Sequence, residues 1–173
     1  YKDGDGNRIH SSFERRNQML QLGLTPTENT LLTGTYERSR GEAAYADRMM
    51  DGSKFDRDAW NVRFVQRNIA PWFTELELRY GQSKIDHVMD TYSLRYLRMM
   101  GSQVKKAMNP KRETDTGHLK ATFDWPDINL QTGIDYMRDK HLARMEMHGE
   151  GYTHKPYQPQ QNFTQWGGFA EGA

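Results

Sequence analysis

The sequence predicts an all-β chain, namely about seven antiparallel strands of a transmembrane β-barrel with short turns at one end and long loops at the other. Three observations predict this fold. Apolar and polar residues alternate in at least six segments, short proline-containing connections alternate with long polar ones, and aromatic residues mark both ends of the apolar faces. Period-two alternation is typical of strands, because successive side chains point to opposite faces of a sheet.

Each expected strand presents one mainly apolar face. In chain order, these faces are Leu20, Leu22 and Leu24; Leu32, Gly34 and Tyr36; Trp60, Val62 and Phe64; Thr74, Leu76, Leu78 and Tyr80; Leu119, Ala121, Phe123 and Trp125; and Ile128, Leu130, Thr132, Ile134 and Tyr136. The first strand is expected to begin near residue 7, and a last one covers about 161–173. Because closed bacterial barrels usually have an even number of strands, about seven strands predict a portion of a larger barrel.

The connections between the strands fall into two classes. The short ones, at 25–29, 68–71 and 125–127, contain proline with Asn or Asp, which favour tight turns. The long ones, at roughly 39–57, 87–113 and 141–160, are polar. Short turns at one end and long loops at the other are the layout of an outer-membrane barrel, with periplasmic turns and extracellular loops.

Alternation alone does not distinguish a lipid-facing barrel from a soluble β-barrel or sandwich. Trp72 and Trp125 lie beside the short turns, whereas another aromatic set lies towards the long loops: Tyr36, Trp60, Tyr80 and Tyr136. About eight residues separate the two sets, which spans roughly 20 Å in a tilted strand, close to the apolar band of such barrels. The opposite face carries charged residues such as Glu75, Glu77 and Arg79, which favours a wet or plugged lumen.

Composition narrows the function. Only 35% of residues are hydrophobic, but the 12% aromatic content favours a folded chain over a disordered one. The formal net charge of +1 gives no broad field for nucleic acid, and no apolar stretch approaches the ~18 residues of a membrane helix. No motif of a nucleophile elbow or phosphate loop is present, so we do not expect an enzyme.

Methionine gathers in the expected long loops, which hold Met49, Met50, Met89, Met99, Met100, Met108, Met145 and Met147. Any one of these could simply fill a gap in a packed loop. Thioethers favour Cu(I), however, and imidazole also suits copper. We therefore predict a metal site at His87 with Met89, which share a face if the strand continues through them. A weaker candidate is the run Met145, Met147 and His148.

Several runs resemble the barrel of TonB-dependent copper receptors of Gram-negative outer membranes. They are 1–7, 35–42, 85–90, 133–136 and 166–169, and the similarity covers the whole chain, 1–173, as a middle section of that barrel. The resemblance implies a 22-stranded barrel around an N-terminal plug, with copper held by a His-x-Met pair of the barrel and a Cys-x-x-x-Met pair of the plug. His87 and Met89 match the first pair, whereas the chain has no cysteine and no plug.

The expected function is therefore copper import across the bacterial outer membrane. The expected partners are a copper ion, Cu(I) in particular, the plug domain of the same receptor, TonB through that plug, and outer-membrane lipid, with no nucleic acid. One alternative is a TonB-dependent receptor for an iron chelate or another small ligand, in which the methionines only pack and Arg95, Tyr96 and Arg98 form the recognition surface. Another is a soluble β-rich binding domain.

Overall fold

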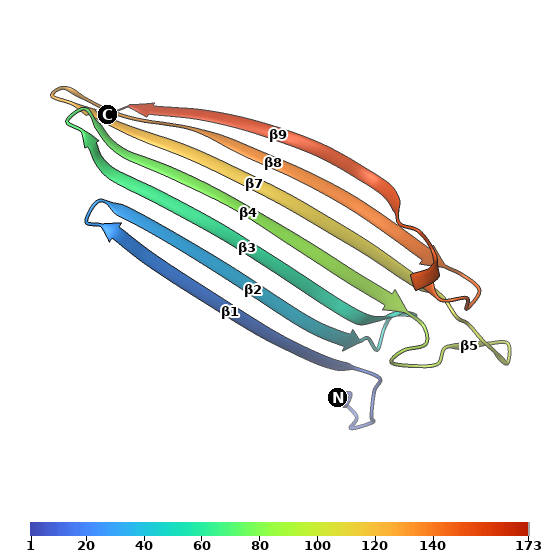
Figure 1. The fold of residues 1–173 in the computed structure, drawn as a ribbon. Coiled ribbons are helices and arrows are strands. Elements are labelled where there is room, and N and C mark those ends of the chain that lie inside the picture. The colour runs from blue at the N-terminus through green and yellow to red at the C-terminus, as the bar shows by residue number, and fades with distance from the viewer. Residues whose placement is uncertain (173) are drawn as a thin grey trace.

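In the computed structural model, which describes residues 1–172, seven long strands form one antiparallel sheet (Figure 1). The strands are β1 (Ser12–Thr27), β2 (Thr30–Ala44), β3 (Asp51–Ala70), β4 (Phe73–Asp90), β7 (Ala107–Trp125), β8 (Ile128–Glu146) and β9 (Gln158–Gly172). A small hairpin of β5 (Arg98–Met99) and β6 (Ser102–Gln103) and a 3-10 turn η1 (Tyr152–His154) lie in the links. Each long strand pairs with the next one along the chain, and the sheet is open.

The register aligns the apolar residues predicted from the sequence on one face of this sheet. One row runs directly across six strands: Leu24, Leu32, Phe64, Leu78, Leu119 and Ile134. In the row above it, Tyr80 aligns with Gly117, Tyr136 and Trp166. We call this side the outer face, and the predicted alternation is confirmed.

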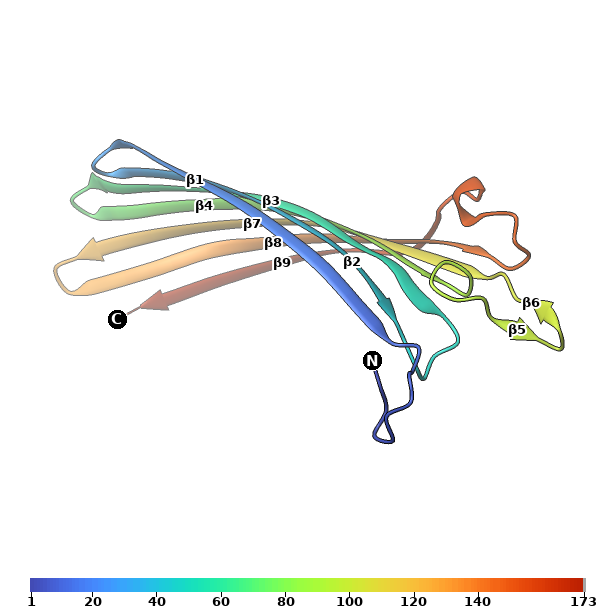
Figure 2. The same cartoon turned by 90° about the horizontal axis from the view of Figure 1, so that it is seen from below.

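The opposite side, here called the inner face, carries buried charge. Glu77 is only 2% exposed and accepts a hydrogen bond from Arg63 Nε at 2.8 Å, with Arg79 donating to the same carboxylate. Its chain neighbour Leu78, on the outer face, is 43% exposed. In a single sheet, side chains cover one another where the sheet is concave and spread apart where it is convex, so the inner face is the concave one. Figure 2 shows the curvature and twist of the sheet.

Aromatic side chains gather at both ends of the outer face, as predicted. Near the short turns, Phe73 and Phe123 stack with ring centroids 5.0 Å apart, and Trp72 and Trp125 flank them. Towards the other end, Tyr136 packs against Trp166 at 4.7 Å, while Trp60 packs against Tyr80 at 5.5 Å. Their amphipathic rings are what the two interfaces of a bilayer favour.

The short connections are two-residue turns at 28–29, 71–72 and 126–127, all at one end of the sheet (Figure 1). Pro71 and Pro126 lie in their turns, as expected. Pro26 instead lies within β1, where the register shifts between Leu24 and Thr27, because proline has no N–H to donate to the ladder. Residues 1–172 contain no helix that is long and apolar enough to cross a membrane.

The predicted bounds of the long loops were wrong, because all three loops are shorter than predicted. The links are 45–50, 91–106 and 147–157, so the strands continue well past their apolar segments. Cross-strand ion pairs such as Arg40 with Asp56, at 3.3 Å, lie in these extensions. The regular row of apolar outer-face residues stops before these extensions, but backbone pairing continues through them. As a result Met89, Met108 and Met145 lie in strands rather than in loops.

Candidate metal centre

The extension of β4 carries the predicted pair. Because β4 continues to Asp90, His87 and Met89 lie on the same face, two residues apart, as the sequence prediction required. They continue the inner-face series of Glu77 and Arg79, because the register of β4 with β7 does not shift between Glu75 and Asp90. Both side chains therefore belong to the concave side of the sheet, beyond the aromatic rows.

Two more methionines join Met89 across the neighbouring strands. Met89 is the direct partner of Met108 on β7, and Met108 is the direct partner of Met145 on β8. We call these three residues the methionine row. Directly opposed residues have Cβ atoms about 4.5–5.5 Å apart, so three thioethers line one path across the sheet. Met108 and Met145 are 42% and 50% exposed, so an ion could reach them from solvent.

The imidazole of His87 is half-buried, and its Nε2 atom is buried without a hydrogen-bond partner among residues 1–172. Burial lowers the pKa of His87, and only the charge of Asp86 opposes this. The ring is therefore neutral at pH 7 and keeps a lone pair for a ligand. A buried polar nitrogen without a partner is costly unless something binds it, which fits a metal ligand.

A polar network on the other side of β4 fixes the backbone at His87. Asn109, fully buried on β7, donates to the His87 carbonyl oxygen at 2.9 Å and to Asp86 Oδ1 at 2.6 Å. Its own side-chain oxygen accepts from Arg144 Nε at 2.8 Å and from Tyr157 Oη at 2.7 Å. One amide thus joins β4, β7, β8 and the link before β9.

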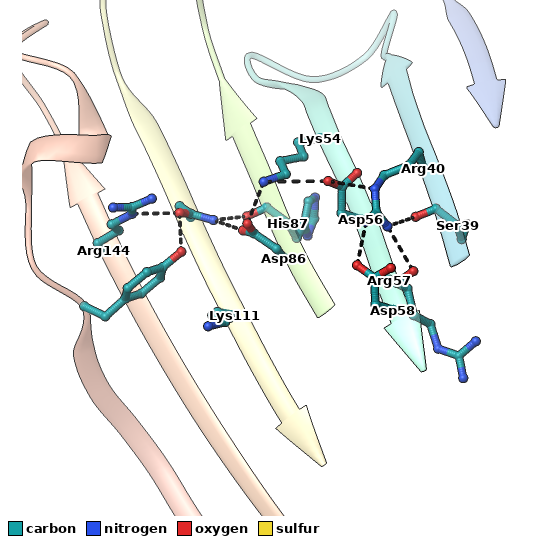
Figure 3. Close-up of polar contacts among 12 residues, drawn as sticks. Ser39, Arg40, Lys54, Asp56, Arg57, Asp58, Asp86, His87, Lys111 and Arg144 are labelled. Atoms are coloured by element: carbon teal, nitrogen blue, oxygen red, sulfur yellow. Dashed lines mark hydrogen bonds and ion pairs between the residues drawn. The ribbon is translucent and has the colours of Figure 1, made fainter. Parts of the chain in front are cut away.

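The network continues towards β2 through ion pairs (Figure 3). Lys54 Nζ lies 2.6 Å from Asp86 and 3.7 Å from Asp56. Arg40 on β2 then pairs with Asp56 at 3.3 Å and with Asp58 at 2.5 Å. This row of alternating charge explains why the strands stay paired here without an apolar face, and it holds the end of β4 in place.

The second candidate cluster is only partly assembled. Met145 lies on β8 and joins the methionine row, but β8 ends at Glu146. Met147 and His148 therefore lie outside the strand, in the link that follows. Sequence reasoning missed Met108 as a neighbour of both Met89 and Met145.

In the structure, Arg95 of the alternative recognition surface is bound to other parts of the chain. Arg95 is not free to meet a ligand, because its guanidinium donates to Asp51 Oδ1 at 2.8 Å and to the Tyr45 carbonyl at 3.0 Å. Asp51 is fully buried and also faces His10 Nε2 at 2.8 Å. Arg95 therefore ties the link 91–106 to the link 45–50.

No group of three or more His, Cys, Asp or Glu side chains that could hold a metal ion occurs within residues 1–172. His87 and the methionine row instead place one imidazole and three thioethers on the inner face of neighbouring strands. Soft neutral donors of this kind favour Cu(I).

Comparisons with known proteins support the fold. Neither a scan against protein-family models nor a search of curated proteins found a match. Among solved structures, the chain is similar to "Copper transporter OprC", with a TM-score of 0.87 and 34% sequence identity over 99% of this chain. The chain spans 27% of the length of that transporter. The predicted all-β fold and the predicted resemblance to a section of a copper-receptor barrel are confirmed.

Proposed function

We propose that this chain, 1–173, is a barrel section of a TonB-dependent outer-membrane receptor that imports copper. His87 and Met89 bind the ion from the inner face, Met108 and Met145 extend the soft surface, and Met147 with His148 are a weaker capture site. The observation that supports this most is the alignment of three methionines beside an imidazole with an unpartnered Nε2. The similarity to a copper transporter also supports the proposal.

In such a receptor, the sheet, the lipid and the plug have different roles. The sheet supplies a rigid wall, lipid contacts the outer face, and a plug domain of the same receptor fills the concave side and couples to TonB. Transport moves an ion without making or breaking a covalent bond, so the protein is not an enzyme. Neutral imidazole and thioether donors select Cu(I) over Cu(II), and a thiolate from the plug would strengthen this preference.

The test is copper stoichiometry in the full-length receptor that carries this chain, purified in detergent. Wild type is compared with His87→Ala and Met89→Ala, with Met137→Ala as the matched control. Met137 lies on the inner face of β8 but is aligned with Thr116, outside the methionine row. We expect both ligand variants to lose stoichiometric Cu(I) and the control to retain it. Undiminished binding in the ligand variants would overturn the assignment.

A further inference from the structure

The ring of His87 lies against an aromatic ring of the neighbouring strand. Phe55 on β3 is its direct cross-strand partner, and the two ring centroids are 4.2 Å apart with 29° between the ring planes. Both residues line a cavity of about 510 Å³ on the inner face, together with apolar side chains such as Phe13 and Ile85. The imidazole thus has a flat apolar wall on one side and open space nearby.

Metal-binding histidines are usually oriented by a hydrogen bond from the second ring nitrogen. No such bond is made to either ring nitrogen of His87 within residues 1–172, and Nε2 is buried without a partner. Something other than a hydrogen bond must therefore fix the plane of this ring. Stacking on Phe55 is the contact that does so.

Gly52 provides the space that this contact needs. A Cβ atom at Gly52 would lie 2.0 Å from Phe55 Cε2 and 2.2 Å from Cζ, so the ring of Phe55 occupies the place of a side chain. The register shift between Gly52 and Lys54 allows this fold-back along β3. Gly52 is the cross-strand partner of Met89. The ring of Phe55 therefore lies beside the two β3 positions that pair with His87 and Met89, the proposed ligands.

We infer that Phe55 is a positioning residue for copper binding, which holds the His87 imidazole plane, and that Gly52 makes room for it. This inference rests on the proposed function, because it assumes that His87 is a ligand. Phe55 itself touches no ion. Its effect passes entirely through His87, which makes the effect separable from general packing.

The experiment measures Cu(I) affinity in the full-length receptor, by competition with a chelator of known affinity, and the imidazole signal in X-ray absorption at the copper edge. Phe55→Leu removes the flat ring, and Gly52→Ala displaces it without changing it. Phe55→Tyr keeps the stack, and Phe13→Leu changes another wall of the same cavity. We expect Phe55→Leu and Gly52→Ala to weaken binding by about 10- to 100-fold, the usual effect of losing an outer-shell partner.

The imidazole signal should weaken in parallel, whereas Phe55→Tyr and Phe13→Leu should bind like wild type. In a His87→Ala background, Phe55→Leu should have no further effect, because both act through one ring. Unchanged affinity and an unchanged imidazole signal in Phe55→Leu and Gly52→Ala, in a receptor where His87→Ala loses copper, would overturn the inference alone. If His87→Ala retains copper, the proposed function fails instead.

Discussion

The assignment of an outer, lipid-facing side can be tested at two adjacent residues of β7. Ala121 lies on the outer face, four positions from Gly117 in the upper aromatic row and four from Trp125 beside the short turn. At about 3.3 Å per residue and a tilt of about 40°, it is roughly 10 Å from each end of the apolar band. If the outer face contacts lipid, Ala121 therefore lies close to the middle of the bilayer.

The perturbation is Ala121→Arg, and the matched control is Thr122→Arg. An arginine at the midplane of the lipid face costs about 2–4 kcal/mol in barrels of this kind. Thr122 points to the inner face and is aligned with Glu75, so an arginine there gains a carboxylate neighbour and changes stability by less than about 1 kcal/mol. The two variants carry the same added charge one position apart, so they differ only in the face of the sheet that carries it.

The assay is reversible unfolding by urea of the full-length receptor in lipid vesicles, followed by tryptophan fluorescence. We expect Ala121→Arg to reduce the folding equilibrium constant by about 30- to 700-fold and Thr122→Arg to leave it nearly unchanged. An equal loss in both variants would refute the assignment of faces. A neutral effect of Ala121→Arg would favour the soluble β-domain alternative.

Three further predictions concern other parts of the sheet. Glu77→Gln should lower the free energy of unfolding by about 1–3 kcal/mol in the same urea assay, because two arginines lose a buried carboxylate; an unchanged midpoint would contradict this. Gly133→Ala should also destabilise the sheet, by about 1–3 kcal/mol, since its Cβ would lie 2.4 Å from an aromatic ring and 2.5 Å from a backbone oxygen. Gly34→Ala should be neutral, because no atom lies within 4 Å of the position of its Cβ. Met108→Leu should slow copper uptake into cells several-fold without abolishing stoichiometric binding, and Met137→Leu should not; equal rates in both would exclude a role for the methionine row.

Much of the fold could be predicted from the sequence, because apolar and polar residues alternate strictly along the strands and two of the three short turns contain proline. Strand ends could not be predicted, since above the aromatic row the outer face of β4 is no longer apolar and the pairing depends on ion pairs such as Lys54 with Asp86. His87 with Met89 could be placed on one face by period-two reasoning alone, and the structure has them so.

The neighbours of that pair are harder to predict. Counting outward from the two-residue turn at 126–127 does align Met108 with Met145, so this contact was available from the sequence. The contact of Phe55 with His87 could not be predicted from the sequence. The register shift between Arg67 and Ala70 moves the pairing of β3 with β4 by one residue, and simple counting from the turn would align Phe55 with Val88 on the wrong face.

Under the proposed function, the height of the candidate site along β4 determines how far copper must still move after it binds. His87 lies seven positions beyond Tyr80, or about 18 Å above the upper aromatic row at a tilt of about 40°. An ion bound there has not begun to cross the membrane, and roughly 20 Å of apolar band still lies below it. Tight binding at that height retains copper without delivering it. Under the proposed function, release into the periplasm therefore requires a change at the ligands themselves.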